Sequence, residues 1–579
     1  MKKNFVKMKW LFTALLFVAA LIMPSMVWAE NITPTKPNGE GTADNPYQIG
    51  TAAELYWFAG LVNGDASVCT NGITRNNYAC AVLTQNIIVN KGQNANDVAN
   101  SNGIKADNWV EWTPISYDKS YPWIGTFDGR NHYVSGLFYN KEEKGDKYVY
   151  VGLFGYLYSG GKISNVGVVD SYFLTNEAVG GICGYNEDGT IENCYNEGTI
   201  VGRVGNHQGI GGVCGYNGHS IKNCYNKGTI IGGLIKQYTG GVCGINGLDI
   251  ANCYNFGNIV AQADGICGGI CGKNYDNCII ENCYYLEGCN AEGTTFTNSN
   301  GTSKTVEQFK SGEVTYLLSQ GCTIEEYDVS YDGSAWGQDI ATDEYPVPNS
   351  PYKVLMAAQD GEDDSNYWAT FSNLTNDATL SVPSDRTLKV YNATVSGGKM
   401  TLTQRSDNQV AKEEGVLLKT DGVYVNAKAN ETNELAKVPS DDNHLVATPA
   451  EAETVIADAG YKLYRLTYKN AATKENLGFY LSVDKDNNSS NGTRLKATPG
   501  KAYLQVYEDD AKDPSSAALA RSFVFGNDSE TTGIEGITII GTDLQRHNTL
   551  EGFFDLQGRK ICSPTNGIYI KNNKKVIIK

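Results

Sequence analysis

The sequence predicts an all-β protein built around a parallel β-solenoid, followed by a β-sandwich-like domain and a short C-terminal β tail. Three observations lead to this prediction. The 579 residues include 64 glycines and 36 tyrosines, a composition typical of short strands joined by many turns. A unit of about 30 residues recurs between residues 151 and 290, as expected for a repeat architecture. Apolar residues rarely follow helical spacing, so most apolar segments are expected to be strands.

Residues 1–29 have the features of a secretory signal peptide. Four lysines precede an apolar run at residues 10–23, and Val27 and Ala29 occupy the small-residue positions before the expected cleavage site. The run is shorter than the ~20 residues that a spanning helix needs. We therefore expect an exported protein that starts at Glu30, has no transmembrane span after cleavage, and is extracellular or associated with the cell surface and outer membrane.

Length and charge limit the possible organisation and partners. The formal net charge of −17 argues against nucleic acid as a partner, because phosphates attract clustered Lys and Arg. The chain is also too long for one hydrophobic core. We predict a signal peptide (1–29), an N-terminal cap with the first rungs (30–150), the repeats (151–290), a helical or irregular closing segment (291–350), the sandwich-like domain (351–530) and the tail (531–579).

The repeat becomes visible when its glycine-rich segments are aligned. GGICGYNEDGTIENCYN begins at Gly180, GGVCGYNGHSIKNCYN begins at Gly211, and related units begin at Gly152, Gly240 and Gly268. Each unit contains two short apolar segments separated by Gly and Asn turns, which indicates a rung of short strands. Stacked rungs lie ~4.8 Å apart, so equivalent side chains are expected to form columns.

Four such columns are predicted. Two consist of cysteines that recur once in each unit: Cys183, Cys214, Cys243 and Cys271 in one, and Cys194, Cys224, Cys253 and Cys283 in the other. An amide ladder at a turn is predicted for Asn193, Asn223, Asn252 and Asn282, since Asn tolerates the left-handed backbone of such turns. An aromatic column is predicted for Tyr195, Tyr225, Tyr254 and Tyr284. These tyrosines either pack under a flanking loop or contact a ligand, such as a sugar ring.

The cysteines admit two interpretations. Stacked cysteines are close enough to form disulfides, which exported proteins often contain. The first repeat, however, has Phe154 and Val166 at the two cysteine positions, which indicates apolar core sites filled by buried thiols. We favour thiols, and we expect no zinc site because the cysteines recur singly. Cys69 and Cys80 lie outside the columns and are the best candidates for a disulfide.

These units resemble the GLUG-motif repeat of bacterial surface proteins, and the resemblance extends over five copies. The preceding segment resembles the usual opening of such proteins in GEGTADNPYQIGTAAELYWFAGLVN, in WTPI at Trp112 and in GTFDGRNHYVSGL at Gly125. The resemblance implies a surface protein of the Bacteroidetes type. Independently, residues 51–62 predict an amphipathic helix that caps the first rung and protects it from edge pairing.

Helix and strand patterns change after the repeats. Residues 304–321 predict one helix, with Thr305 and Gln308 in capping-box spacing, whose expected role is to close the lower end of the rungs. Residues 352–526 contain short alternating strands separated by turns, typical of a β-sandwich. Leu388 and Val390 alternate with Lys389 and Tyr391, which predicts that one face of this strand is buried.

The C-terminal segment FFDLQGRKICSPTNGIYIKNNKKVIIK resembles the end of the type IX secretion sorting tail. The resemblance rests on Asp555, Gly558 and Arg559, on Gly567 to Tyr569, and on the basic final strand. It implies the secretion machinery as a partner. The alternative is a final hairpin of the preceding domain.

No motif for catalysis is present in the sequence. There is no HExxH and no G-x-S-x-G, and none of the five histidines has a second His or an acid at ligand spacing. We therefore predict a protein that is not an enzyme and that has no cofactor or metal. The leading hypothesis is adhesion or recognition of a host or glycan ligand. The alternatives are a β-helix polysaccharide lyase or glycoside hydrolase, for which Asp128, Asp170 and Glu192 are candidates only by default, and a structural spacer for the sandwich domain.

Overall fold

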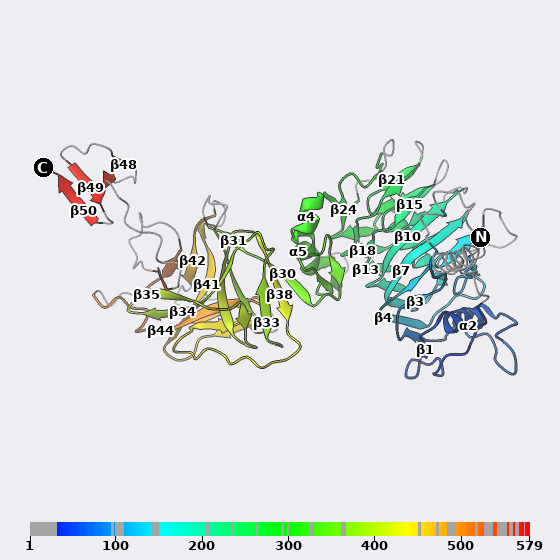
Figure 1. Ribbon diagram of the computed structural model, residues 1–579, viewed down its shortest axis with the longest axis horizontal. Helices are drawn as coiled ribbons and strands as arrows, with labels where there is room; N and C mark the ends of the chain where they lie inside the picture. Colours follow the sequence, from blue (N-terminus) through cyan, green and yellow to red (C-terminus); the bar gives the residue numbers. More distant parts are fainter. Residues whose placement is uncertain are drawn as a thin grey trace, which may run out of the picture. The chain divides into compact units, whose positions relative to one another are not determined.

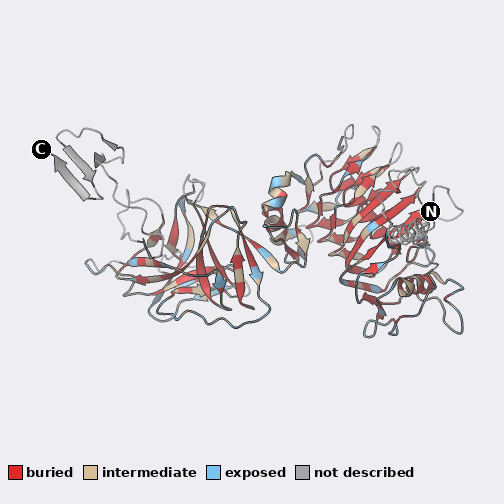
Figure 2. Ribbon diagram, viewed as in Figure 1, coloured by how far each residue is buried: buried red, intermediate tan, exposed pale blue. Residues whose placement is uncertain are grey.

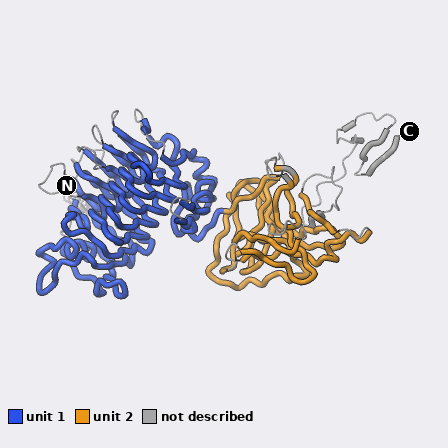
Figure 3. The backbone as a smooth tube through the Cα atoms, turned by 180° about the vertical axis from the view of Figure 1, so that it is seen from behind, with its two compact units in different colours: residues 1–354 blue, residues 355–579 orange. Residues whose placement is uncertain are grey.

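The structure is a computed structural model, and the chain divides into two compact units, residues 1–354 and 355–579 (Figure 3). It describes residues 32–93, 98, 109–141, 150–203, 209–232, 237–261, 265–290, 295–297, 300–324, 329–360, 366–373, 375–449, 453–470, 474–482, 492–515 and 519–525, and the backbone of 537–540, 553–554, 560–561, 567–571 and 574–578. The predicted signal peptide, as well as Asp555, Gly558 and Arg559 of the predicted tail, lies outside the described residues.

The first unit contains the predicted parallel β-solenoid, with about four turns over residues 154–285. Its rungs stack side by side, as β7, β10 and β15 show in Figure 1. One sheet consists of β6 (Phe154–Leu157), β8 (Cys183–Asn186), β12 (Cys214–Asn217), β17 (Cys243–Asn246) and β22 (Cys271–Asn274). A second consists of β11 (Gly209–Gly211), β16 (Tyr238–Gly240) and β21 (Ile266–Gly268).

The third sheet continues into the N-terminal region and contributes between one and three strands to each rung. Its strands are β1 (Tyr47–Ile49), β2 (Ala81–Leu83), β3 (Ile87–Ile88), β4 (Thr126–Ser135), β5 (Phe138–Asn140), β7 (Lys162–Thr175), β9 (Thr190–Glu192), β10 (Tyr195–Gly202), β13 (Ser220–Lys222), β14 (Tyr225–Asn226), β15 (Thr229–Ile231), β18 (Asp249–Ala251), β19 (Tyr254–Asn255), β20 (Ile259–Val260), β23 (Ile279–Glu281), β24 (Tyr284–Leu286) and β25 (Thr302–Lys304).

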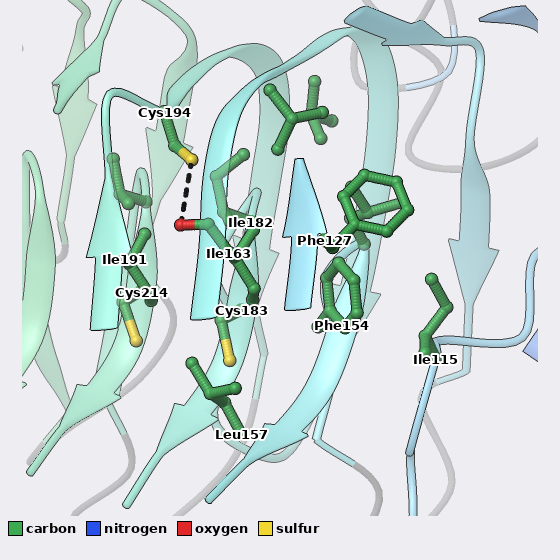
Figure 4. Packing of buried hydrophobic residues seen from close by; sticks show 14 of the residues in the cluster. Ile115, Phe127, Phe154, Leu157, Ile163, Ile182, Cys183, Ile191, Cys194 and Cys214 are labelled. Atoms are coloured by element: carbon green, nitrogen blue, oxygen red, sulfur yellow. Dashed lines mark hydrogen bonds between the residues drawn. The ribbon is translucent and has the colours of Figure 1, made fainter. Parts of the chain in front are cut away.

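Strand pairing follows the repeat register. Cys214 lies opposite Cys183 on one side and Cys243 on the other, and Ile221 lies between Ile191 and Ile250. Equivalent apolar side chains therefore form one continuous core along the rungs. Figure 2 shows that buried residues recur from rung to rung. Figure 4 shows this interior, in which Cys183, Cys194 and Cys214 lie among Ile163, Ile182, Ile191 and Leu157.

The helix predicted at the start of the solenoid is confirmed as α2 (Ala52–Asn63), but it is not amphipathic, because residues around most of its circumference are buried. The hydroxyl of Thr51 accepts a hydrogen bond from the Glu54 N–H at its N-terminus, and Gly64 ends it with a φ of 73°. Residues from Leu55 to Val62 are buried apart from Tyr56, so the helix packs against the first rungs on most of its surface.

Two short helices replace the single helix expected after the repeats. They are α4 (Val306–Lys310) and α5 (Glu313–Ser319), and the predicted capping box of Thr305 and Gln308 is present. The break is at Gly312, which has a φ of 90°, a left-handed conformation that a continuous helix cannot contain. Further along are β26 (Cys322–Ile324), β27 (Val329–Tyr331), β28 (Trp336–Gly337) and β29 (Val347–Pro348).

The closing segment buries a carboxyl group at the side of a rung. The Tyr331 hydroxyl donates to Oδ2 of Asp249 at 3.0 Å, and Asp249 is 7% exposed. Burial raises the pKa of the Asp249 carboxyl above its usual value, against the opposing effects of the Tyr331 hydrogen bond and the nearby His219.

The second unit consists of mainly antiparallel sheets that pack face to face, as predicted for a sandwich-like domain. The central sheet contains β31 (Ala358–Gln359), β32 (Tyr367–Ser372), β37 (Gly415–Thr420), β34 (Leu388–Ser396), β35 (Lys399–Gln404) and β46 (Ile537–Ile540). Another contains β39 (Leu445–Ala447), β44 (Ala502–Tyr507), β41 (Tyr461–Asn470), β42 (Glu475–Leu481) and β45 (Ser522–Val524). A third sheet contains β30 (Tyr352–Met356), β38 (Tyr424–Ala429), β33 (Ala378–Ser381) and β36 (Gln409–Val410), and β40 (Thr454–Ile456) pairs with β43 (Arg494–Lys496).

The central sheet is buried on both faces, so the prediction of one buried face is wrong for β34. Val390 belongs to the core shared with β33, β36 and β38, whereas Tyr391 is 2% exposed in the core shared with β41, β42 and β44. Val416 and Leu417 in β37 divide between the two cores in the same way. The prediction failed because Lys389 and Tyr391 lie on the same side of the strand, and a side that contains a Lys resembles one that faces solvent.

The predicted tail does not form one piece. Its first strand, β46, pairs in parallel with β35 and so belongs to the central sheet of the sandwich-like domain. The remaining strands, β47 (Phe553–Phe554), β48 (Lys560–Ile561), β49 (Gly567–Lys571) and β50 (Lys574–Ile578), form a separate antiparallel sheet.

The core position of Cys194 generates a first prediction. The preceding rung has Val166 at the equivalent site, so Cys194→Val should change the free energy of unfolding by under about 1.5 kcal/mol. Cys194→Asp places an unpaired charge in the dry core and should cost several kcal/mol. Urea unfolding of the two variants measures both effects. Equal and small losses for both would contradict a dry interior.

Asp249 generates a second prediction, on pH dependence. A carboxyl whose pKa is raised by folding favours the folded state below its unfolded pKa, and this contribution is lost as the pH rises through the folded pKa. Asp249→Asn keeps an acceptor for Tyr331 but cannot ionise, so it should be more stable than the wild type at pH 7, with the difference shrinking towards pH 4. Urea midpoints against pH measure this, with the exposed Asp188→Asn as control. A difference independent of pH would contradict the assignment.

Candidate functional site

The two predicted cysteine columns lie inside the solenoid. Seven of the eight side chains are fully buried and Cys283 is 3% exposed. Every cysteine in the described part of the chain is a free thiol. Burial raises the pKa of the Cys183 and Cys243 thiols well above the usual value, and the Sγ of Cys194 donates to the Ile163 carbonyl at 3.7 Å (Figure 4). These cysteines therefore act as small apolar side chains.

The disulfide predicted between Cys69 and Cys80 is not formed. The Cys69 N–H donates to the Asp65 carbonyl in the turn after α2. The Cys80 N–H donates to the Gly41 carbonyl, and its Sγ lies 3.7 Å from the Tyr78 carbonyl. Different elements thus hold the two thiols, and burial raises the pKa of Cys69.

The predicted tyrosine column exists, but it is covered. The rings of Tyr195 and Tyr225 stack at a centroid distance of 4.9 Å, and those of Tyr225 and Tyr254 at 5.0 Å. The closing segment places Phe309, Val314, Leu318 and Trp336 over them. Tyr225, Tyr254 and Tyr284 are 4%, 0% and 9% exposed. For these three tyrosines the packing alternative is therefore confirmed and the ligand-binding role is wrong. The closing segment covers this face of the solenoid and also adds β25 to the last rung.

The predicted turn asparagines adopt left-handed backbone with φ between 49° and 53°, but they form only part of an amide ladder. The Asn282 amide donates to Oδ1 of Asn252 at 2.8 Å. Asn223 and Asn252 instead donate to carbonyls of the closing segment, at Asp332 and Tyr331. Asn193 donates to Asn165 of the preceding rung. The turn column thus anchors the closing segment.

Two continuous amide ladders were not predicted. In one, the Nδ2 of Asn186 donates to Asn217, Asn217 to Asn246 and Asn246 to Asn274, at 2.8, 2.9 and 2.8 Å. In the other, Asn196 donates to Asn226 and Asn226 to Asn255, both at 2.8 Å. All but Asn274 are fully buried. The signal was present in the recurring G-x-N and CYN triplets.

A cavity of about 600 Å³ beside α2 is the candidate binding site, because concave sites with a few convergent polar groups are where ligands usually bind. Helix α2 contributes one wall and the 113–117 segment another, and the ends of β5 and β7, Pro34 and the loop after α2 complete the lining. Its lining includes Tyr56, Asn63, Asp65, Arg75, Thr113, Tyr117, Tyr139, Lys141 and Glu177.

Asn63 at the end of α2 fixes the first two walls against each other. Its Nδ2 donates to the Pro114 carbonyl at 2.9 Å, and its Oδ1 accepts from the Ser116 N–H at 2.9 Å. The Arg75 guanidinium donates to the Asn63 carbonyl and lies 3.5 Å from the centroid of the Tyr121 ring. This side of the cavity is therefore held by several directed contacts.

Charged groups lie beside the part of the cavity that the end of β5 forms. Lys141 pairs with Glu111 at 2.9 Å, and its ammonium lies 5.3 Å from the Tyr139 ring centroid. Burial, together with the Glu111 charge, raises the pKa of Tyr139 to about 12, so its hydroxyl stays protonated. The Tyr56 hydroxyl donates to the Glu111 carbonyl at 3.0 Å. The site thus presents neutral phenols beside both signs of charge.

Sequence reasoning missed this cavity because no motif marks it. Its residues come from six separate stretches between Pro34 and Glu177, which only the folded chain brings together. In the described residues, no three His, Cys, Asp or Glu side chains are grouped so that they could hold a metal ion. No helix in the described part is long and apolar enough to cross a membrane.

The comparisons with known proteins agree with the repeat. A family model, the GLUG motif, matches residues 175–201 and 206–231. Among solved structures, a putative immunoglobulin A1 protease from Bacteroides ovatus is 20% identical, with a TM-score of 0.35, over 54% of this chain and 95% of that one. That likeness is too low to carry an argument. No curated protein matches. The chain therefore contains GLUG repeats within its β-solenoid.

Proposed function

We propose that this chain is an exported, non-catalytic recognition protein of the cell surface that binds a host or glycan ligand. The observation that carries the proposal is the cavity beside α2, which combines tyrosine rings with donors and acceptors at the first rungs of a GLUG-repeat solenoid. Such mixed lining suits reversible binding, in which aromatic rings supply contact area and polar groups supply specificity.

Three features support display outside the cell. Residues 1–29 have signal-peptide composition, and GLUG repeats fit a surface or recognition protein. The C-terminal segment that resembles a secretion sorting tail would address the secretion machinery, and the type IX route of Bacteroidetes is the corresponding proposal. The stacked rungs, with continuous hydrogen bonding between them, form a stiff support that holds a site in fixed geometry.

Surface labelling tests this proposal. An antibody raised against residues 151–290 should label intact cells that express the full chain, and protease added outside should remove the label. Deleting residues 1–29 should abolish labelling, and deleting residues 541–579 should also abolish it, because the protein could no longer cross the outer membrane. Labelling that appears only after the cells are permeabilised would contradict the proposal.

The two alternative functions are tested by incubation with polysaccharides and by ligand binding. The purified chain should leave acidic and neutral polysaccharides intact, with no new reducing or unsaturated ends. New ends would instead establish a glycan-cleaving enzyme. Ligand binding confined to residues 355–579, with an inert solenoid, would identify the solenoid as a spacer.

A further inference from the structure

We propose that the cavity beside α2 binds a neutral sugar unit of a glycan, and this inference rests on the proposed recognition function. The proposal names both a site and a ligand class. It follows from three properties of the cavity: its aromatic surface, the mixture of donors and acceptors, and the balance of its charges.

The aromatic surface comes from three different elements. Tyr56 belongs to α2, Tyr117 to the 113–117 segment and Tyr139 to β5. Tyr139 is 4% exposed and the Tyr56 hydroxyl is already engaged, so Tyr117, which is half-buried, offers the most available ring. Pro34 and Pro114 add further rigid apolar surface. Rigid tyrosine rings provide contact area at a low entropic cost, which suits the C–H face of a sugar ring.

The polar groups suit hydroxyls, which both donate and accept hydrogen bonds. Arg75 and Lys141 supply donors, and the carboxylates of Asp65 and Glu177 supply acceptors. A ligand that only accepts, such as a phosphate, would leave the carboxylates facing like charge. An apolar ligand would displace water from these four charged groups and offer no hydrogen bond in its place.

The charge balance decides between neutral and acidic glycans. The lining contains two cationic and two anionic side chains, and Glu111, which pairs with Lys141, adds a further negative charge nearby. The whole chain carries a formal charge of −17, which repels polyanions at long range. Both the carboxylates at the cavity and the net negative charge of the chain therefore disfavour a sugar that carries carboxylate or sulfate groups.

The cavity is also preorganised. Asn63 makes its hydrogen bonds to the 113–117 segment without a ligand, and the Gly64 turn that ends α2 positions Asp65. The Asp65 carboxylate is itself fixed by the N–H and hydroxyl of Ser67, at 2.7 and 2.8 Å. Walls fixed in advance reduce the entropy that binding must overcome.

Calorimetric titration of the full chain tests the inference. The probes are hexasaccharides of β-1,4-linked glucose, α-linked mannose and β-linked galactose, with hyaluronan and polygalacturonate fragments as acidic counterparts. At least one neutral probe should bind. Tyr117→Ala, which removes the available ring, and Thr113→Trp, which fills the cavity from an exposed position, should each weaken that binding at least tenfold. Tyr158→Ala, at an exposed tyrosine of the solenoid outside the lining, should leave it unchanged.

Each outcome has a distinct meaning, provided that thermal melting shows the variants folded. Neutral-glycan binding that survives both cavity variants would overturn the assigned site while leaving the recognition function in place. Binding of acidic fragments only would overturn the ligand class. Binding of no glycan would overturn the inference, and surface labelling would then decide separately whether the recognition function also fails.

Discussion

Buried amide ladders are the interaction on which the solenoid depends. Each ladder asparagine acts twice: Oδ1 of Asn226 accepts from Gly228 of its own rung, at 3.2 Å, and from Nδ2 of Asn196 in the preceding rung, at 2.8 Å. Its own Nδ2 then donates to Asn255 of the following rung. The same side chain thus closes a turn and fixes the register. A slip of one residue would leave buried amides unpaired, which is costly in a dry interior.

This fixed register places the other columns. Because the rungs align residue by residue, thiols meet thiols in the core and tyrosines stack on the outside. The closing segment exploits that regularity: its Trp336 donates to the Asn252 carbonyl at 3.1 Å, and the Tyr254 hydroxyl donates to Pro346 at 2.5 Å. At the other end, α2 covers the first rungs and forms a wall of the cavity. The repeats therefore serve as support, and the non-repeating caps supply the distinctive chemistry.

A feature could be predicted from the sequence when it depends on neighbouring or regularly spaced residues, and not when it depends on segments far apart in the chain. The cysteine columns were visible because the regular period of the repeat aligns them, and α2 because the apolar residues between positions 51 and 62 follow a helical pattern. The ladders at Asn186 and Asn196 were equally periodic, but the sequence does not distinguish a buried amide from a solvated turn residue. The sequence left open whether Tyr225 packs against a flanking segment or contacts a ligand, because its burial depends on the closing segment, which lies far along the chain. The cavity could not be predicted either, because its lining comes from stretches that lie far apart in the sequence.

A double-mutant cycle on the ladder tests the stacked architecture most directly. Asn196→Ala and Asn226→Ala should each cost about 1–3 kcal/mol in urea unfolding, because each leaves buried partners unpaired. Since the two amides share one hydrogen bond, the double variant should lose less than the sum, with a coupling energy of about 0.5–3 kcal/mol. Asn196→Ala combined with Asn246→Ala, in the other ladder, should be additive. Additive losses for Asn196 and Asn226 would contradict the rung register.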